Sequence, residues 1–169
     1  QRAFLLFPHV NLDGDALGSC AALCRTLRLQ GKNVWIMLED DIPAICVFWT
    51  EDTAHGIRIR SRSRTYVCAW TAAIQADFRA EPKNLPPERR PYALDHHMTL
   101  NSSAIIIHVE PEEAATGQIY STSWALWAQS PIKRRGEAIF AAITTDTGDF
   151  QYSNTQKKSH LIAAQLYDW

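Results

Sequence analysis

The stretch that decides the fold is AFLLFPHVNLDGDALGSCAALCRTLRLQGKNVWIML, residues 3–38. It opens with the continuous apolar run Ala3–Phe7, which is typical of a buried parallel strand. Small and apolar residues then recur at helical spacing over residues 15–30, and Gly31 follows as a stop signal. A second apolar run covers residues 34–38. A strand, a helix and a strand in this order predict a right-handed crossover unit.

The same alternation continues along the rest of the chain. Strands are predicted at 66–70, 92–94 and 104–109, and helices at 44–49, 114–129, 137–144 and 156–167. This pattern predicts an α/β fold with a doubly wound, mainly parallel sheet and helices on both faces. The proline-rich segment 81–91 is interpreted as a loop. The basic stretch 58–64 is interpreted as a solvated loop or strand edge, with phosphate contact as the alternative.

Composition places these elements in one domain spanning residues 1–169, a length that allows a sizeable core. Charged residues make up 21% and the net charge is −1, so charge alone predicts no polyanion-binding field. No apolar run is long enough to span a membrane, and no signal peptide is recognised before Phe4. The cysteines at 20, 24, 46 and 68 form no Cys-x-x-Cys pair. We interpret Cys20 and Cys24 as buried, reduced residues, which predicts a cytoplasmic location.

Three clusters of acidic and histidine residues follow apolar runs, at residues 9–15, 95–97 and 145–148. Ligands of doubly wound sheets bind beyond the carboxyl ends of the strands, where these clusters are expected to lie. The side chains expected to converge there are those of His9, Asp13, Asp15, His96 and Asp146. Carboxylates and imidazoles in this number suit a pair of hard divalent cations and metal-assisted hydrolysis of phosphoesters.

Each cluster also has a simpler interpretation. Asp13 and Asp15 could merely cap the following helix. The adjacent histidines 96 and 97 could be structural or incidental, and Asp146 could be a turn residue at the end of a helix. In the functional interpretation, the N-terminus of the first helix would favour a phosphate group, and Asp95 could fix the tautomer of a neighbouring histidine. Gly14 is expected to permit a tight backbone, and Gly18 a close approach of helix and sheet. The isolated histidines at 55, 108 and 160 are interpreted as packing or surface residues.

Four motifs in this order resemble the DHH phosphoesterase superfamily. They are HVNLDGDALGS at 9–19, DHH at 95–97, ATGQIY at 115–120 and TDTGDFQYSNT at 145–155. The resemblance covers nearly the whole chain and is strongest to the oligoribonuclease and pAp phosphatase branch. The GDFQYSNT segment favours that branch over family II pyrophosphatases, which share the metal residues.

The resemblance implies a catalytic domain with two Mn²⁺ ions that hydrolyses short oligoribonucleotides or the nucleotide pAp. It implies that His9 and Asp13 serve one ion. It implies that the other ion is held by Asp15, His96 and Asp146. His97 would contact the scissile phosphate, with Asp95 as its catalytic partner. A C-terminal substrate-binding domain, which such enzymes carry, is expected to be absent from these 169 residues. Assembly as a homodimer is left open.

The chain departs from the family pattern at one metal ligand. A bridging aspartate is expected directly after the central strand, where Thr71 stands, and Asp77 is too distant in sequence to replace it. Smaller departures are Leu100, where asparagine is usual, and Gln118, where glutamate is common. Thr71 therefore predicts impaired hydrolysis. The alternatives are a catalytically weakened domain that binds metal or nucleotide, and a cyclic-dinucleotide phosphodiesterase.

Overall fold

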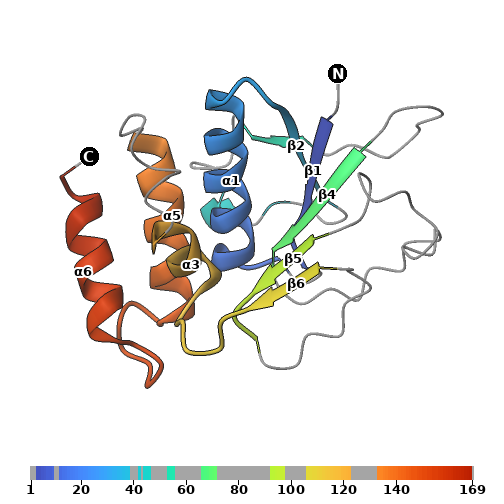
Figure 1. Ribbon diagram of the computed structural model, residues 1–169. Coiled ribbons are helices and arrows are strands. Elements are labelled where there is room, and N and C mark those ends of the chain that lie inside the picture. The colour runs from blue at the N-terminus through green and yellow to red at the C-terminus, as the bar shows by residue number, and fades with distance from the viewer. Residues whose placement is uncertain are drawn as a thin grey trace.

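The structure is a computed structural model that describes residues 3–9, 12–38, 42, 44–46, 53–55, 66–71, 92–97, 106–122 and 133–168. In this part of the chain, six parallel strands form one sheet in the order β3-β2-β1-β4-β5-β6 (Figure 1). The strands are β1 (Ala3–Phe7), β2 (Asn33–Met37), β3 (Ala54–His55), β4 (Tyr66–Thr71), β5 (Tyr92–Asp95) and β6 (Ile106–Val109). The helices are α1 (Gly14–Leu29), α3 (Thr116–Thr122), α5 (Lys133–Asp146) and α6 (Lys157–Leu166), with a short 3₁₀ turn η1 (Ala44–Cys46).

The topology places a switch point between β1 and β4. From β1 the chain passes through α1 to β2 and β3 on one side, and β4, β5 and β6 then extend the sheet on the other side. The register pairs Phe7 with Trp70 and Thr71 with Leu94, so the ends of β1, β4 and β5 lie next to one another. This is the part of a doubly wound sheet where ligands bind.

The crossover unit predicted from residues 3–38 is confirmed. Asp13 caps α1, since its Oδ1 accepts a hydrogen bond from the backbone N–H of Ala16 at 2.8 Å. The helix ends at Leu29, and Gly31 follows with a φ of 72°, a left-handed conformation that favours glycine. The apolar side of α1 packs on β1 and β2, and Leu6, Leu17 and Ile36 are fully buried in that contact.

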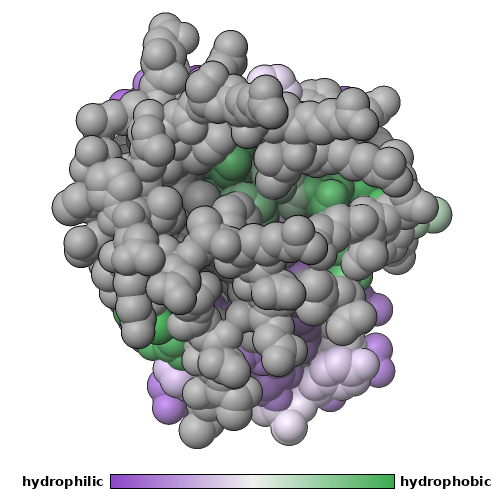
Figure 2. All heavy atoms as spheres, turned by 90° about the vertical axis from the view of Figure 1, so that its right-hand side faces the viewer, coloured by the Kyte–Doolittle hydropathy of each residue, from purple (hydrophilic) through white to green (hydrophobic). Residues whose placement is uncertain are grey.

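The described helices all lie on one side of the sheet (Figure 1). α1 packs on the strands, α5 packs against α1 and α3, and α6 packs against α5. The view from the other side shows apolar side chains of described residues in its middle and hydrophilic ones toward its lower end (Figure 2). The α/β class and the parallel sheet are therefore confirmed. Among the described residues, helices cover one face of the sheet, and the predicted cover of the second face stays a prediction.

Several boundaries differ from the sequence predictions. β3 was not predicted, because two residues carry no periodic signal. α5 begins at Lys133, four residues before the predicted start, because its first turn is basic and adds nothing to an apolar stripe. β6 begins at Ile106, and the structure describes only 116–122 of the helix predicted at 114–129. The segments predicted as loops at 58–64 and 81–91, and residues 77 and 100, lie outside the described residues.

Glycines set the close packing of α1 against α5. A Cβ atom added to Gly18 would lie 2.3 Å from the backbone oxygen of Ala138 in α5. The expectation that Gly18 brings helix and sheet together is therefore wrong, because its close neighbour is another helix. The expectation that Gly14 permits a tight backbone stays a prediction. A Cβ atom added to Gly14 would lie 2.3 Å from the side chain of Thr145 in α5, so this glycine also serves the packing of α1 against α5.

Replacing Gly18 with alanine is expected to lower the free energy of unfolding by about 1–3 kcal/mol, the usual cost of overpacking. The gain in helix propensity, about 1 kcal/mol, offsets only part of the clash with a backbone oxygen. Urea unfolding of the wild type and of Gly18→Ala checks this prediction: an equally stable or more stable Gly18→Ala protein would contradict it.

The same elements bear on the remaining predictions, which concern the cysteines, the isolated histidines and membrane-spanning helices. Cys20 and Cys24 are fully buried on α1, as predicted, and with Cys46 they form no disulfide; the side chain of Cys68 is outside the described part. His108 lies exposed on β6 and pairs with Glu110, and His160 stacks on Phe150, so neither lies in the clusters. No helix among the described residues is long and apolar enough to cross a membrane.

Candidate metal centre

Asp15 occupies the first turn of α1 and is almost fully buried, with 2% of its surface exposed. Its two carboxylate oxygens accept hydrogen bonds from the backbone N–H groups of Thr116 and Gly117, at 2.9 and 3.0 Å, and from the hydroxyl of Ser19 at 3.0 Å. Asp15 therefore does not cap its own helix. It caps α3, which lies 101 residues later in the chain, and these donors hold its carboxylate in one orientation.

His96 follows β5, and its ring is fixed by a backbone carbonyl. Nδ1 lies 3.2 Å from the carbonyl oxygen of Glu113, which can only accept, so the proton is assigned to Nδ1. Nε2 then carries the lone pair. It is buried beside two carboxylates, 2.9 Å from Asp146 Oδ2 and 3.6 Å from Asp15 Oδ2, and pairs with them when it is protonated. An imidazole whose far nitrogen donates to a carbonyl is the usual arrangement of a metal-ligating histidine.

Asp146 is the last residue of α5 and completes a group of three. One ligand atom each from Asp15, His96 and Asp146 lies within 4.8 Å of the others. The three residues come from α1, from the end of β5 and from α5, and the packing of those elements at one edge of the sheet brings them together. The buried Nε2 and the two carboxylates fit a divalent cation. A second group within the same distance, Asp95, His96 and His97, shares His96 with the first.

His9 and Asp13 form a pair of their own. Nε2 of His9 lies 3.1 Å from Oδ2 of Asp13, while Oδ1 of Asp13 is used by the cap of α1. Asp13 can therefore cap α1 and still offer an oxygen to a metal ion. The cap uses Oδ1, while Oδ2 faces the imidazole of His9. Burial alone would raise the pKa of Asp13, but the bonds from His9 and Ala16 and the nearby histidine charges bring it below its ordinary value.

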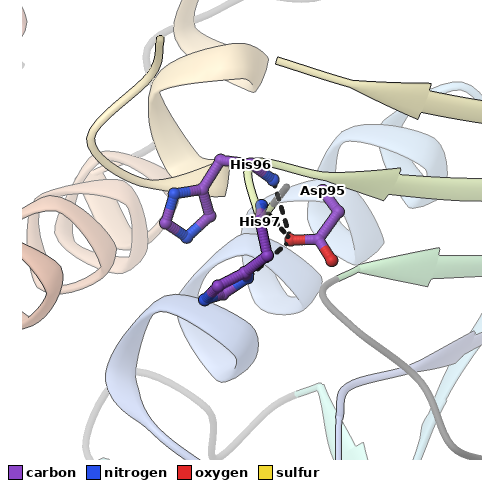
Figure 3. A group of neighbouring side chains, drawn as sticks. All are labelled: Asp95, His96 and His97. Carbon is purple, nitrogen blue, oxygen red and sulfur yellow. Dashed lines mark hydrogen bonds and ion pairs between the residues drawn. The ribbon is translucent and has the colours of Figure 1, made fainter. Parts of the chain in front are cut away.

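Asp95 orients His97 (Figure 3). Its Oδ1 accepts hydrogen bonds from the backbone N–H groups of His96 and His97, at 2.7 and 3.1 Å, and from Nδ1 of His97 at 2.8 Å. Asp95 is fully buried, whereas the side chain of His97 is 46% exposed. The bond from Asp95 raises the pKa of His97, against the opposing effect of burial, and so favours a cationic imidazole with Nε2 toward solvent.

The two carboxylates and the imidazole of the three-residue group lie close enough to shift one another's pKa values. Burial, followed by the negative charge of Asp146, raises the pKa of Asp15 to about 6. Burial would lower the pKa of His96, but the contact with Asp146 and the charge of Asp15 together raise it. Two carboxylates and a buried lone pair at this distance destabilise one another unless a proton or a cation lies between them.

This crowding predicts that Mn²⁺ affinity rises through about pH 6, where Asp15 loses its proton, and goes on rising until His96 is deprotonated above its ordinary pKa, because the cation must displace protons from both. In the metal-free chain, the raised pKa of Asp15 has the opposite consequence. Its contribution to stability is present below its ordinary pKa of 3.8 and is lost as the pH rises through about 6. Calorimetric titration with Mn²⁺ at several pH values checks the predicted rise in affinity. An affinity independent of pH would contradict it.

Position 71 lies between the ligand-bearing segments. Thr71 is the last residue of β4, which runs between β1, followed by His9 and Asp13, and β5, followed by His96. Its backbone is paired with Leu94, next to Asp95. The side chain of residue 71 is outside the described part. The backbone alone puts this position beside both candidate cation groups.

The segment between β6 and α3, which contacts the candidate ligands, was not recognised from the sequence. Gln118 and Ser159 are fully buried and bonded to each other and to the partly buried Glu113: Gln118 donates to Glu113 Oε2 at 2.8 Å, and the Ser159 hydroxyl donates to Gln118 Oε1 at 2.5 Å. Gln118, which departs from the family pattern, is therefore a packing residue that ties α3 to α6. The only signal in the sequence was its place within the ATGQIY motif.

Comparison with known proteins supports the resemblance seen in the motifs. No protein-family model matches the chain. The chain is 28% identical over 166 residues to the bifunctional oligoribonuclease and PAP phosphatase NrnA of Thermus thermophilus. The match covers 94% of this chain and 47% of that protein, so the chain spans about half the length of this relative.

Two solved structures share the fold. An exopolyphosphatase-related protein of Bacteroides fragilis has a TM-score of 0.73 and 21% identity, over 99% of this chain and 52% of that one. A putative family II inorganic pyrophosphatase of Methanococcus jannaschii has a TM-score of 0.70 and 14% identity, over 98% of this chain and 55% of that one. The resemblance to DHH phosphoesterases and the α/β fold predicted from the sequence are thereby confirmed.

Proposed function

We propose that this chain is the catalytic domain of a Mn²⁺-dependent phosphoesterase that acts on short oligoribonucleotides or pAp. The observation that carries the proposal is the group of Asp15, His96 and Asp146, whose ligand atoms, the buried Nε2 of His96 among them, lie within 4.8 Å of one another. The similarity to the oligoribonuclease and PAP phosphatase supports the substrate class.

The three residues would hold one cation, and His9 with Asp13, which supply only two ligands, would hold a second more weakly. Divalent cations in such sites lower the pKa of water and offset the charge that develops on a phosphoryl group. The chain supplies the orientation. Glu113 keeps the Nε2 lone pair of His96 toward the site, and the N-terminus of α3 keeps the carboxylate of Asp15 in place.

His97 would contact the phosphate. Its Nδ1 is engaged by Asp95, so a protonated ring presents Nε2–H to a phosphate oxygen from the exposed side of the site. Asp95, which is buried and bonded through Oδ1 to three donors, does not have to move in this interaction. The two adjacent imidazoles thus have separate tasks, His96 toward the cation and His97 toward the substrate.

One observation favours a weakened enzyme as the alternative. Thr71 stands beside both cation groups, where the resemblance calls for a bridging carboxylate. Without it, three aspartates face two divalent ions, which leaves a charge of about +1 and two ions that repel at roughly 3.5–4 Å. In that case the chain would bind one Mn²⁺, at the three-residue group, and turn over substrate slowly or only bind it.

Turnover of pAp and of a diribonucleotide, measured with Mn²⁺ and again after chelation, tests the proposal. We expect slow hydrolysis that disappears when the metal is removed. Mn²⁺ binding without hydrolysis of either compound would support the weakened domain. Hydrolysis that survives chelation would overturn the metal-dependent function. A cyclic dinucleotide, assayed as a third substrate, tests the alternative of a cyclic-dinucleotide phosphodiesterase.

A further inference from the structure

The ligands of the candidate metal centre are held by one loop. Residues 110–117 comprise the connection from β6 to α3 and the first two residues of α3, and this loop contacts two of the three ligands. The carbonyl of Glu113 faces Nδ1 of His96, and the N–H groups of Thr116 and Gly117 donate to Asp15. The third ligand, Asp146, lies on a different element and receives no bond from this loop in the described structure.

Asn154 connects this loop to the third ligand. Its Nδ2 donates to the backbone oxygen of Asp146 at 2.9 Å and to the backbone oxygen of Ala114 at 3.3 Å. An amide nitrogen has two protons, so each carbonyl can accept one of them. The orientation of the amide follows from this chemistry, because its oxygen could bond neither carbonyl. One side chain therefore bridges the C-terminus of α5 and the loop that orients Asp15 and His96.

A turn with an unusual backbone conformation lies between the end of α5 and Asn154. Gly148, Asp149 and Phe150 have φ values of 53°, 55° and 65°, so three successive residues are left-handed, which non-glycine residues rarely adopt. The hydroxyl of Thr147 accepts a hydrogen bond from the N–H of Phe150 at 3.1 Å, and the Phe150 ring stacks on His160. A conformation this unfavourable persists only where surrounding contacts fix it, and such turns concentrate at functional sites.

Further contacts fasten the segment after Asn154 to the same loop. The amide of Gln156 donates to the backbone oxygen of Glu112, and the ammonium group of Lys158 pairs with the carboxylate of Glu113. Neither contact involves a ligand-bearing residue directly. The contribution of Asn154 is thus distinct, since it alone among these contacts touches the backbone of Asp146.

We propose that Asn154 is a positioning residue that sets the spacing of the three cation ligands, an inference that rests on the proposed function. Without its amide, the end of α5 and the loop 110–117 keep their separate contacts but lose their direct bridge. The donor atoms of Asp15, His96 and Asp146 would then have to be ordered by the cation itself, and this cost appears as weaker binding. Loss of residues that orient metal ligands typically reduces metal affinity by about 10–100-fold.

The test is a calorimetric titration of the whole 169-residue chain with Mn²⁺, for the wild type, Asn154→Ala and Gln156→Ala. Gln156 is the matched control, because it is also an exposed amide that donates to a carbonyl of this loop. We expect a loss of affinity of about 10-fold or more for Asn154→Ala and less than about 3-fold for Gln156→Ala. The melting temperatures of the two metal-free variants should be similar, and the Mn²⁺ electron paramagnetic resonance spectrum should change only for Asn154→Ala.

Each outcome decides the proposal. Equal affinities of the two variants would overturn the role of Asn154 and leave the proposed function standing. A wild-type chain that binds no Mn²⁺ would overturn both. If Asn154→Ala does not fold, Asn154→Gln keeps the amide but displaces it by one methylene group. Wild-type affinity in the Asn154→Gln variant would then contradict the proposal.

Discussion

Replacing Asp146 with asparagine is expected to reduce Mn²⁺ affinity by about 100-fold or more, while the metal-free chain remains at least as stable as the wild type. The affinity falls because one of three protein ligands loses its charge. Stability is retained because the charge of Asp146 crowds the buried Asp15, whose pKa it helps to raise to about 6. An asparagine amide removes this repulsion and can donate a hydrogen bond to Nε2 of His96.

Asp149→Asn is the matched control for this variant. It changes the net charge by the same amount, three residues further along, at an exposed position with a left-handed φ that asparagine tolerates. Calorimetry gives the affinities, and urea unfolding above the titration range of His96 gives the stabilities. A loss of more than about 1 kcal/mol in the metal-free Asp146→Asn protein would show that this carboxylate is a structural residue.

Replacing Thr71 with aspartate is expected to create a second Mn²⁺ site and to increase turnover of pAp on the order of 100-fold or more. The backbone places position 71 at the end of β4, between the strands that precede His9 and His96. A carboxylate there supplies the anion that two neighbouring cations need to share. Thr71→Asn, which has a similar shape and no charge, should do neither.

Titration with Mn²⁺ and turnover of pAp and a diribonucleotide measure both effects. We expect one well-occupied ion in the Thr71 protein, at Asp15, His96 and Asp146, and two in the aspartate variant. Two tight sites with full turnover in the Thr71 protein would contradict this expectation. Water or substrate would then have to bridge the ions in place of residue 71.

The sequence predicts the elements of this fold well where one physical signal dominates. The run Ala3–Phe7 and the stripe on α1 are apolar at the right period, and Gly31 marks the end of the helix, so their boundaries are close to the observed ones. Signals of this kind are absent from the two residues of β3 and from the basic first turn of α5. There, Arg135 is fully buried, which no hydrophobic pattern predicts.

The candidate site was predictable as a set of residues and not as a set of contacts. Asp15, His96 and Asp146 stand out because their residue types follow apolar segments, and doubly wound sheets place ligands at such ends. The anchoring of Asp15 by α3 joins residues 101 positions apart. The bridge made by Asn154 likewise depends on tertiary packing, because nothing in the local sequence indicates which carbonyls an exposed amide will contact.

The measurement that tests the central claim most directly is a crystal structure of this chain grown with Mn²⁺, with diffraction data collected at the manganese absorption edge. The account predicts an anomalous peak between Asp15 Oδ2, Nε2 of His96 and Asp146 Oδ2, the atoms that already lie together. A structure whose anomalous peaks all lie elsewhere, or that shows none at saturating Mn²⁺, would contradict it.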